Sequence, residues 1–308
     1  MNIKILCLFL VLILLIRFSA FSQQVVDSLF TIDVKEPAYQ LIDSPLIILD
    51  EAHNNGSKLS TSFKPTSKIL VKDGYTVKSN SEQISTHLLK RVDILVIIDA
   101  LAIENVDHWK LPNPSAFSES EIETIHTWVE KGGSLLLVAD HMPFAGASKK
   151  LAAAFGVKFF NGFAIDTVGW DLTKFNRDEK TLQNHPVTEG KNADEQVNEI
   201  STYFGQCFTT SNNGLEPIMV FNDENIVNYS PMVAWRFNRN TDTFAAKGYF
   251  QGIIGAYGNG RLAVLGDSSI ILAHIIGENE RQIGINSIET KDNLQFTLNL
   301  FHWLSHLF

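Results

Sequence analysis

Four short apolar runs, each ending in an aspartate, constrain the fold of this chain more than any other feature of its sequence. The runs cover residues 45–50, 92–99, 134–140 and 261–267, and they end at Asp50, Asp99, Asp140 and Asp267. A strand buried on both faces of a parallel sheet is continuously apolar, whereas a half-exposed antiparallel strand alternates apolar and polar residues. We therefore predict that the four runs are parallel neighbours in one sheet, with their acids at one edge.

Helical patterns lie between and after these runs. The clearest one begins with a capping box of Ser118 and Glu121 and continues with apolar residues at helical spacing until Gly132. The helices that we expect cover residues 81–89, 118–131, 147–155 and 292–307. Alternation of apolar strands with helices is typical of α/β proteins, so we predict a three-layer sandwich with a mainly parallel central sheet.

Residues 165–250 depart from this alternation. The stretch 165–215 has no long period, and we expect it to cover the sheet edge or a ligand cleft. The stretch 217–250 alternates like antiparallel strands. We therefore predict a single α/β domain over residues 23–308 that carries a covering segment and a β-rich insertion at 165–250.

The first 22 residues have the pattern of a secretory signal peptide. Lys4 precedes an apolar run at 5–16, and Ala20 and Ser22 provide the small residues that a signal peptidase recognises, which places cleavage before Gln23. A membrane-spanning helix needs about 20 apolar residues, so this run is short for a bilayer span, and an uncleaved anchor is the second choice. We predict a periplasmic or secreted protein without a stable membrane anchor after cleavage.

The charge of the chain argues against nucleic acid as a partner. The full sequence has a net charge of −9, and loss of Lys4 and Arg17 with the signal peptide leaves 23 basic against 34 acidic side chains, a net charge of −11. Such a surface repels phosphate backbones. Cys207 would be the single cysteine after cleavage, so no intramolecular disulfide can form and stability must come from the packed core.

Three motifs carry a resemblance to a known family. They are Leu-Asp-Glu-Ala-His-Asn-Asn at 49–55, Gly-Gly-Ser-Leu-Leu-Leu-Val-Ala-Asp-His-Met-Pro-Phe at 132–144, and Gly-Arg-Leu-Ala-Val-Leu-Gly-Asp-Ser at 260–268. Over residues 45–306 the chain resembles an exported bacterial family of the glutamine-amidotransferase-like (flavodoxin-like) superfamily. The resemblance implies a three-layer sandwich with a parallel sheet.

The resemblance does not extend to glutamine hydrolysis. Active amidotransferases carry a cysteine in a Gly-x-Cys-x-Gly turn after the third such strand, and this chain has Asp140 and His141 in that place. Cys207 follows Tyr-Phe-Gly-Gln, which is no such turn. The sequence also lacks the Gly-x-x-x-x-Gly-Lys loop of nucleotide-binding enzymes and the Gly-x-Ser-x-Gly turn of α/β-hydrolases.

Polar side chains that follow the apolar runs form the candidate site, because ligands of open α/β sheets bind beyond the carboxyl ends of the strands. Carboxylate and imidazole groups together suit a divalent metal ion or a base that activates water. The catalytic candidates are Asp50, His53, Asp140, His141 and Asp267, of which the first four are also the candidate metal ligands. The candidate ligand contacts are Glu51, Asn54, Asn55 and Ser268.

The acids also have a purely structural explanation. Asp and Ser at strand–helix junctions commonly cap helices, which stabilises a helix start by about 1 kcal/mol. Asp267 and Asp99 fit this role, whereas no helical pattern follows Asp50.

Two classes of function remain open. The first is an exported hydrolase that acts on a polar small molecule or glycan fragment, with a divalent metal ion as the cofactor that the candidate residues would suit. The second is a non-catalytic binding domain for the same kind of ligand, carbohydrate included. The excess of titratable over aromatic residues near the motifs favours the hydrolase, and the missing nucleophile favours the binding domain.

Overall fold

The strands that precede the four aspartates form the centre of the main sheet in the computed structural model, which describes residues 24–308. They are β2 (Leu46–Asp50), β4 (Ile94–Ile98), β5 (Ser134–Val138) and β15 (Gly260–Leu265), and each pairs in parallel with the next. β3 (Thr76–Asn80) adds a parallel strand outside β2. The prediction of parallel neighbours is confirmed. The signal peptide predicted at 1–22 lies outside the described residues.

The nine-stranded sheet is only partly parallel. Its parallel strands have the order β3-β2-β4-β5-β15, which is second-first-third-fourth-fifth along the chain, as in flavodoxin-like folds. Antiparallel strands continue the sheet beyond β15; they are β14 (Phe250–Tyr257), β10 (Phe208–Thr210), β6 (Val157–Phe159) and, paired to β14, β11 (Glu216–Val220). The predicted mainly parallel sheet is therefore corrected to a mixed one, because the chain after α5 returns as antiparallel strands.

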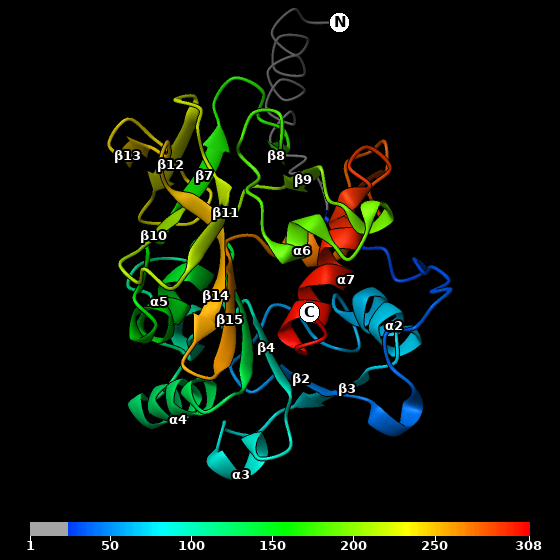
Figure 1. Ribbon diagram of the computed structural model, residues 1–308. Coiled ribbons are helices and arrows are strands. Elements are labelled where there is room, and N and C mark those ends of the chain that lie inside the picture. Colours follow the sequence, from blue (N-terminus) through cyan, green and yellow to red (C-terminus); the bar gives the residue numbers. More distant parts are fainter. Residues whose placement is uncertain (1–23) are drawn as a thin grey trace, which may run out of the picture.

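Helices cover both faces of the sheet (Figure 1). They are α2 (Lys64–Lys72), α3 (Thr86–Leu89), α4 (Glu119–Glu130), α5 (Phe144–Ala154), α6 (Pro186–Glu189) and α7 (Asp292–Leu304). Ile125 of α4 and Leu151 of α5 belong to one buried core with Leu95 of β4. Leu300 of α7 and Leu70 of α2 belong to the core on the other face. Each central strand thus contributes alternate side chains to two cores, which explains its continuously apolar sequence.

Three of the four predicted helices are present, at α4, α5 and α7. The helix expected at 81–89 is restricted to α3, because Ser85 is extended and caps the helix by accepting the Leu88 amide. α2 was not predicted from the sequence. It begins at a proline-containing first turn, where Pro65 is tolerated because the first amides of a helix have no partner.

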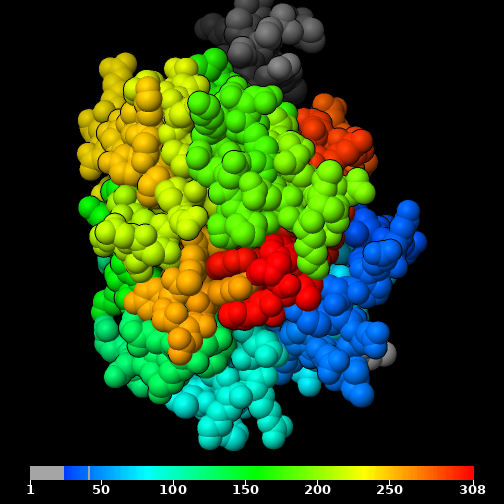
Figure 2. All heavy atoms as spheres, viewed as in Figure 1, coloured from blue at the N-terminus to red at the C-terminus, as the bar shows by residue number. Residues whose placement is uncertain are grey.

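Residues 165–250 add smaller sheets above the main one, and Figure 2 shows this segment over the upper part of the face in view. β7 (Phe163–Asp166), β12 (Ile226–Ser230) and β13 (Asp242–Ala245) form a three-stranded antiparallel sheet. β8 (Thr173–Asn176) pairs with β9 (Glu199–Thr202).

A further sheet joins β1 (Val25–Val26), β16 (Ala273–Ile276) and β17 (Arg281–Gly284). Within residues 24–308, no helix has the length and apolar character to cross a membrane.

Candidate functional site

The strand register separates the four aspartates into two groups. It places Asp50 beside Ile97, two residues short of Asp99 along the strands. Asp140 and Asp267 lie one residue beyond the level of Asp99. Because a strand rises about 3.3 Å per residue, Asp50 lies about 10 Å below Asp140 and Asp267. Asp50 therefore meets different neighbours from the other three acids.

Asp50, His53 and Glu121 form a buried group that we call the inner triad. His53 Nδ1 lies 2.8 Å from Asp50 Oδ2, and His53 Nε2 lies 3.1 Å from Glu121 Oε1. The Phe117 ring packs on the imidazole, with 4.3 Å between the ring centroids. Both imidazole nitrogens are therefore engaged, and the predicted role of His53 as a metal ligand or base would require breaking these contacts.

The two carboxylates of the inner triad favour a positive charge on His53. Burial lowers the pKa of His53, but the hydrogen bond and charge of Asp50 and the charge of Glu121 outweigh it, and the pKa is raised. Burial raises the pKa of Glu121, but hydrogen bonds from Ser118 and from the Ile84 amide, with the charge of His53, lower it overall. A cation between the two carboxylates offsets their mutual repulsion in this buried place. The inner triad thus ties β2 to the start of α4.

The loop after β2 supports the inner triad. Asn55 is buried and donates hydrogen bonds to Asp50 at 3.1 Å and to a β4 carbonyl at 3.2 Å. Asn54 is exposed and donates to a carbonyl of the loop after β4 at 3.1 Å. Glu51 is half-buried and accepts a backbone amide of its own loop at 2.8 Å. Of the ligand contacts predicted in this loop, Asn54 is the exposed one.

Asp99, Asp140 and Asp267 form the second group, which we call the acid cluster. The Asp140 amide donates to Asp99 Oδ1 at 2.9 Å, and the Ser268 hydroxyl donates to Asp140 Oδ2 at 3.0 Å. Asp267 accepts the Tyr203 amide at 2.5 Å. Asp99 and Asp267 are buried, whereas Asp140 is half-buried. Asp140 is therefore the carboxylate of the acid cluster that a ligand can reach most readily.

Helix capping explains only one of these acids. Asp267 caps the short helix η4 (Ser268–Ile271) by accepting the Ser269 amide at 2.7 Å. Asp99 was expected to cap a helix as well, and this expectation is wrong. The next helical turn, η2 (Ile103–Asn105), has a different N-cap residue. The Asp99 side chain instead bonds the backbone that follows β5.

Burial and the charge of Asp140 raise the pKa values of the two buried acids, Asp99 and Asp267. Burial, and next the charge of Asp140, raise the pKa of Asp99 to about 8. The same two causes raise the pKa of Asp267 well above its ordinary value. His274 interacts with Asp140, yet burial lowers the pKa of His274 to about 4 and leaves it neutral. Among residues 24–308, neither Lys nor Arg forms an ion pair with these carboxylates. Bound protons therefore offset the repulsion.

Aromatic rings surround His141, the residue after Asp140. Its imidazole stacks on Phe163 with 4.3 Å between centroids and 17° between planes, and Trp235 meets it edge-on at 4.7 Å. The Trp109 ring lies 6.1 Å away. His141 Nδ1 donates to the carbonyl of the next residue at 2.6 Å. In the part of the chain that the structure describes, His141 Nε2 has no hydrogen-bond partner, although the residue is 8% exposed.

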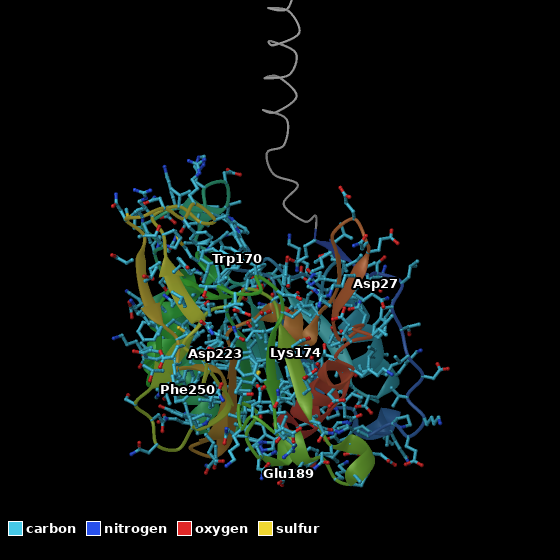
Figure 3. The ribbon with its side chains drawn as sticks, turned by 90° about the horizontal axis from the view of Figure 1, so that it is seen from above. Asp27, Trp170, Lys174, Glu189, Asp223 and Phe250 are labelled. Atoms are coloured by element: carbon cyan, nitrogen blue, oxygen red, sulfur yellow. The ribbon has the colours of Figure 1, made fainter. Side chains whose placement is uncertain are left out.

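These rings come from segments far apart in the sequence, which is why sequence reasoning missed them. Trp109 follows β4, Phe163 lies in β7, Phe204 follows β9 and Trp235 follows β12. Trp109 is 37% exposed, and Phe204 and Trp235 are half-buried. Trp170, labelled in Figure 3, is 54% exposed and lies 6.5 Å from Phe204. No local motif marks these residues, because only the tertiary fold brings them together.

The described residues do not assemble the predicted metal site. Among residues 24–308, no group of three or more His, Cys, Asp or Glu side chains is arranged to hold a metal ion. The register divides the predicted ligands, because Asp50 and His53 belong to the inner triad while Asp140 and His141 belong to the region of the acid cluster. The residues present therefore do not fit a four-ligand shell.

Comparisons with known proteins bear on the fold. No protein-family model and no curated protein matches the chain. Among solved structures, the mmIFT52 N-terminal domain is similar with a TM-score of 0.57 and 13% identity, over 84% of this chain and 97% of that one. Similar structures also include a ThuA-like protein from Bacteroides uniformis, with a TM-score of 0.49, 13% identity, and coverage of 88% of this chain and 93% of that one. A ThuA-like protein from Parabacteroides merdae has a TM-score of 0.44 and 12% identity, over 85% and 90% of the two chains. The first similarity shows a shared α/β fold.

Proposed function

We propose that this chain binds a polar small molecule or glycan at the acid cluster, through the Asp140 carboxylate and the rings around His141. One observation carries the proposal: the half-buried Asp140 directly precedes His141, around which rings from distant segments converge, among them Trp109 and Trp235. Sugars suit such a site, because aromatic faces pack on their C–H surfaces and a carboxylate accepts hydrogen bonds from their hydroxyl groups.

The same geometry argues against the metal-assisted hydrolase. Two of its five catalytic candidates, Asp50 and His53, bond each other inside the inner triad. The sequence favoured a hydrolase because titratable groups outnumbered aromatic groups near the motifs, and the rings around His141 remove that argument. Ser268 donates to Asp140 and thus helps to orient the carboxylate.

A hydrolase without a metal is the second candidate, and the raised pKa of Asp99 favours it. Glycoside hydrolysis usually employs one protonated carboxyl group as the acid and a second carboxylate as the base. In that reaction Asp99 would donate its proton to the leaving oxygen, and Asp140 would accept a proton from the attacking water. The burial of Asp99 weighs against this role, because the residue is only 6% exposed.

We also propose a cellular location and a family for the chain. The pattern of residues 1–22 supports export to the periplasm or medium, with cleavage before Gln23 and no stable membrane anchor afterwards. The strand order, with helices on both faces, supports a three-layer flavodoxin-like domain of the glutamine-amidotransferase-like superfamily. The acidic net charge supports a ligand other than nucleic acid.

Titration with defined oligosaccharides tests the proposed function. The probes are the hexamers of cellulose, chitin, chitosan and polygalacturonate, and the readout is tryptophan fluorescence, since Trp109 and Trp235 lie at the site. We expect at least one hexamer to bind, and Asp140→Asn and Trp235→Ala each to weaken it about tenfold, which is about 1.4 kcal/mol. Trp128→Phe is the matched control, because Trp128 packs against Gly133 at the opposite ends of the strands.

Two results would decide against the proposal. If no hexamer binds, or if both site variants bind with wild-type affinity, ligand binding at the acid cluster is refuted. If mass spectrometry shows shortened hexamers after incubation with the wild type and intact ones with Asp99→Asn, the metal-independent hydrolase replaces the binding domain.

A further inference from the structure

The acid cluster lacks a positive partner of its own. Asp99 and Asp267 each interact with Asp140, and among residues 24–308 none of the three forms an ion pair with Lys or Arg. The basic group that interacts with Asp140 is His274, and its burial keeps it neutral. Bound protons can neutralise the two buried acids, which leaves the negative charge of the half-buried Asp140 facing the ligand.

The aromatic rings provide a second and independent reason to expect a positive ligand. The negative face of an aromatic ring attracts a cation within about 6 Å of its centroid. Trp109, which is 37% exposed, and the half-buried Trp235 pack around His141, the residue that follows Asp140, whereas Phe163 is fully buried against the imidazole. Rings combined with one carboxylate form the usual environment for an ammonium group, because the rings attract its charge and the carboxylate accepts its N–H bonds.

His141 supplies a third observation that points to a ligand. Its side chain is more than nine-tenths buried, its Nδ1 is bonded to a backbone carbonyl, and its Nε2 has no partner within residues 24–308. Because Nδ1 donates to that carbonyl, Nε2 is the nitrogen that remains available to a ligand. An ammonium group donates N–H bonds and accepts none, which matches an acceptor such as the Asp140 carboxylate.

We infer that the ligand of this site carries a protonated primary amine, as in an oligosaccharide of amino sugars. The inference rests on the proposed function and names the chemical class of its ligand. A single ammonium group matches the single carboxylate that the cluster leaves uncompensated. A divalent metal ion is a poorer match, because no set of three ligand side chains is arranged for it among the described residues.

The hexamers of chitosan and chitin test the inference, since they share a backbone and differ in whether the amine is free or acetylated. Affinities are compared by calorimetry at about pH 6, where an amine is protonated. We expect chitosan hexamer to bind the wild type at least about tenfold more tightly than chitin hexamer. Asp140→Asn should abolish this preference, and so should Trp109→Ala, a change at a ring that is 37% exposed. Asp107→Asn, at an exposed acid, should leave it intact.

Proton release provides a readout that depends on the charge itself. A bound ammonium group lowers the pKa of Asp99, so chitosan hexamer should release protons when it binds at about pH 6, and calorimetry in two buffers of different ionisation heat measures this release. Asp99→Asn should remove most of the release while the preference for chitosan remains. Binding without proton release in the wild type would contradict the inference.

The outcomes separate the inference from the proposed function. If neutral or acidic hexamers bind at Asp140 as tightly as chitosan hexamer, the amine inference is overturned and ligand binding stands. If chitosan hexamer binds equally well to wild type and Asp140→Asn, its attraction is a general effect of the acidic surface and the inference is also overturned. If no hexamer binds at all, both proposals fall.

Discussion

Replacement of Asp99 by Asn tests the electrostatics of the acid cluster directly. Asn has nearly the shape of Asp, and its side-chain oxygen can still accept the Asp140 amide, which bonds Asp99 Oδ1 at 2.9 Å. Its amide nitrogen can donate to a neighbouring carboxylate. Asp99→Asn therefore removes the ionisable group with little change in packing, and its effect on stability reports the cost of charging a carboxyl at this position.

The sign of the effect follows from the direction of the pKa shift. Burial and the charge of Asp140 raise the pKa of Asp99 from 3.8 to about 8. Between these two values the folded chain keeps a proton that the unfolded chain has lost, so the free energy of unfolding of the wild type falls as pH rises through this window. A pKa difference of one corresponds to about 1.4 kcal/mol. The difference between 3.8 and about 8 therefore sets an upper limit of about 5 kcal/mol on the stability that the wild type loses above pH 8. Asn cannot ionise, so Asp99→Asn does not lose this stability as pH rises.

Urea unfolding at about pH 4 and about pH 8 measures the prediction. We expect Asp99→Asn to be nearly as stable as the wild type at the lower pH and about 2 to 5 kcal/mol more stable at the higher pH. Asp107→Asn, at an exposed position, serves as the control and should show no such difference. An Asp99→Asn variant that is less stable at the higher pH, or shifted equally at both, would refute the electrostatic account of the cluster.

Three further predictions concern other parts of the chain. His53→Gln should destabilise the fold by about 3 to 5 kcal/mol in urea unfolding, because Asp50 and Glu121 would be left buried without a cation between them. Since the pKa of His53 is raised, its stabilising charge is fully present below about pH 6.5 and is lost as pH rises through the folded-state value, so the gap between wild type and His53→Gln should narrow at alkaline pH. Trp109→Ala should lower the unfolding free energy by about 1 to 3 kcal/mol, because the residue is 37% exposed and its ring packs edge-on against Phe144 at 5.1 Å, and it should also weaken ligand binding. Mass spectrometry of the protein from the envelope fraction should show Gln23 as its first residue, and an intact Met1 there would contradict the predicted cleavage.

The fold was predictable where its signal is local. A continuously apolar strand such as Ile94–Ile98 shows its burial on both faces in five consecutive residues, and both cores of the structure take side chains from it. The capping box of Ser118 and Glu121 was equally visible and is present at the start of α4. The antiparallel half of the sheet was harder to predict, because short strands such as β6 and β10 contain only three residues and pair across long loops.

The site was predictable only as a set of strand-end acids. The sequence shows that Asp50, Asp99, Asp140 and Asp267 each follow a strand, but the register that separates Asp50 from the rest is a property of the assembled sheet. The partner of His53 on α4 lies 68 residues away, and no spacing rule connects the two. The rings around His141 were hidden for the same reason, since each lies in a segment without a motif of its own.

Structural roles explain the hydrogen bonds that the oxygen atoms of the acid cluster accept. They do not explain why the side chains at these positions are ionisable. Asp99 accepts one backbone amide and Asp267 caps a short helix, and the uncharged side chain of Asn could perform either task. Burial and the charge of Asp140 raise the pKa of Asp99 and of Asp267, which lowers the stability of the fold at neutral pH. A positive ligand at Asp140 removes that cost, because it lets the neighbouring acids ionise. Chitosan hexamer should therefore raise the melting temperature of the wild type at about pH 7 by more than it raises that of Asp99→Asn, in which less repulsion remains to be relieved. An equal rise in both proteins would mean that the charges of the cluster and the ligand are not coupled.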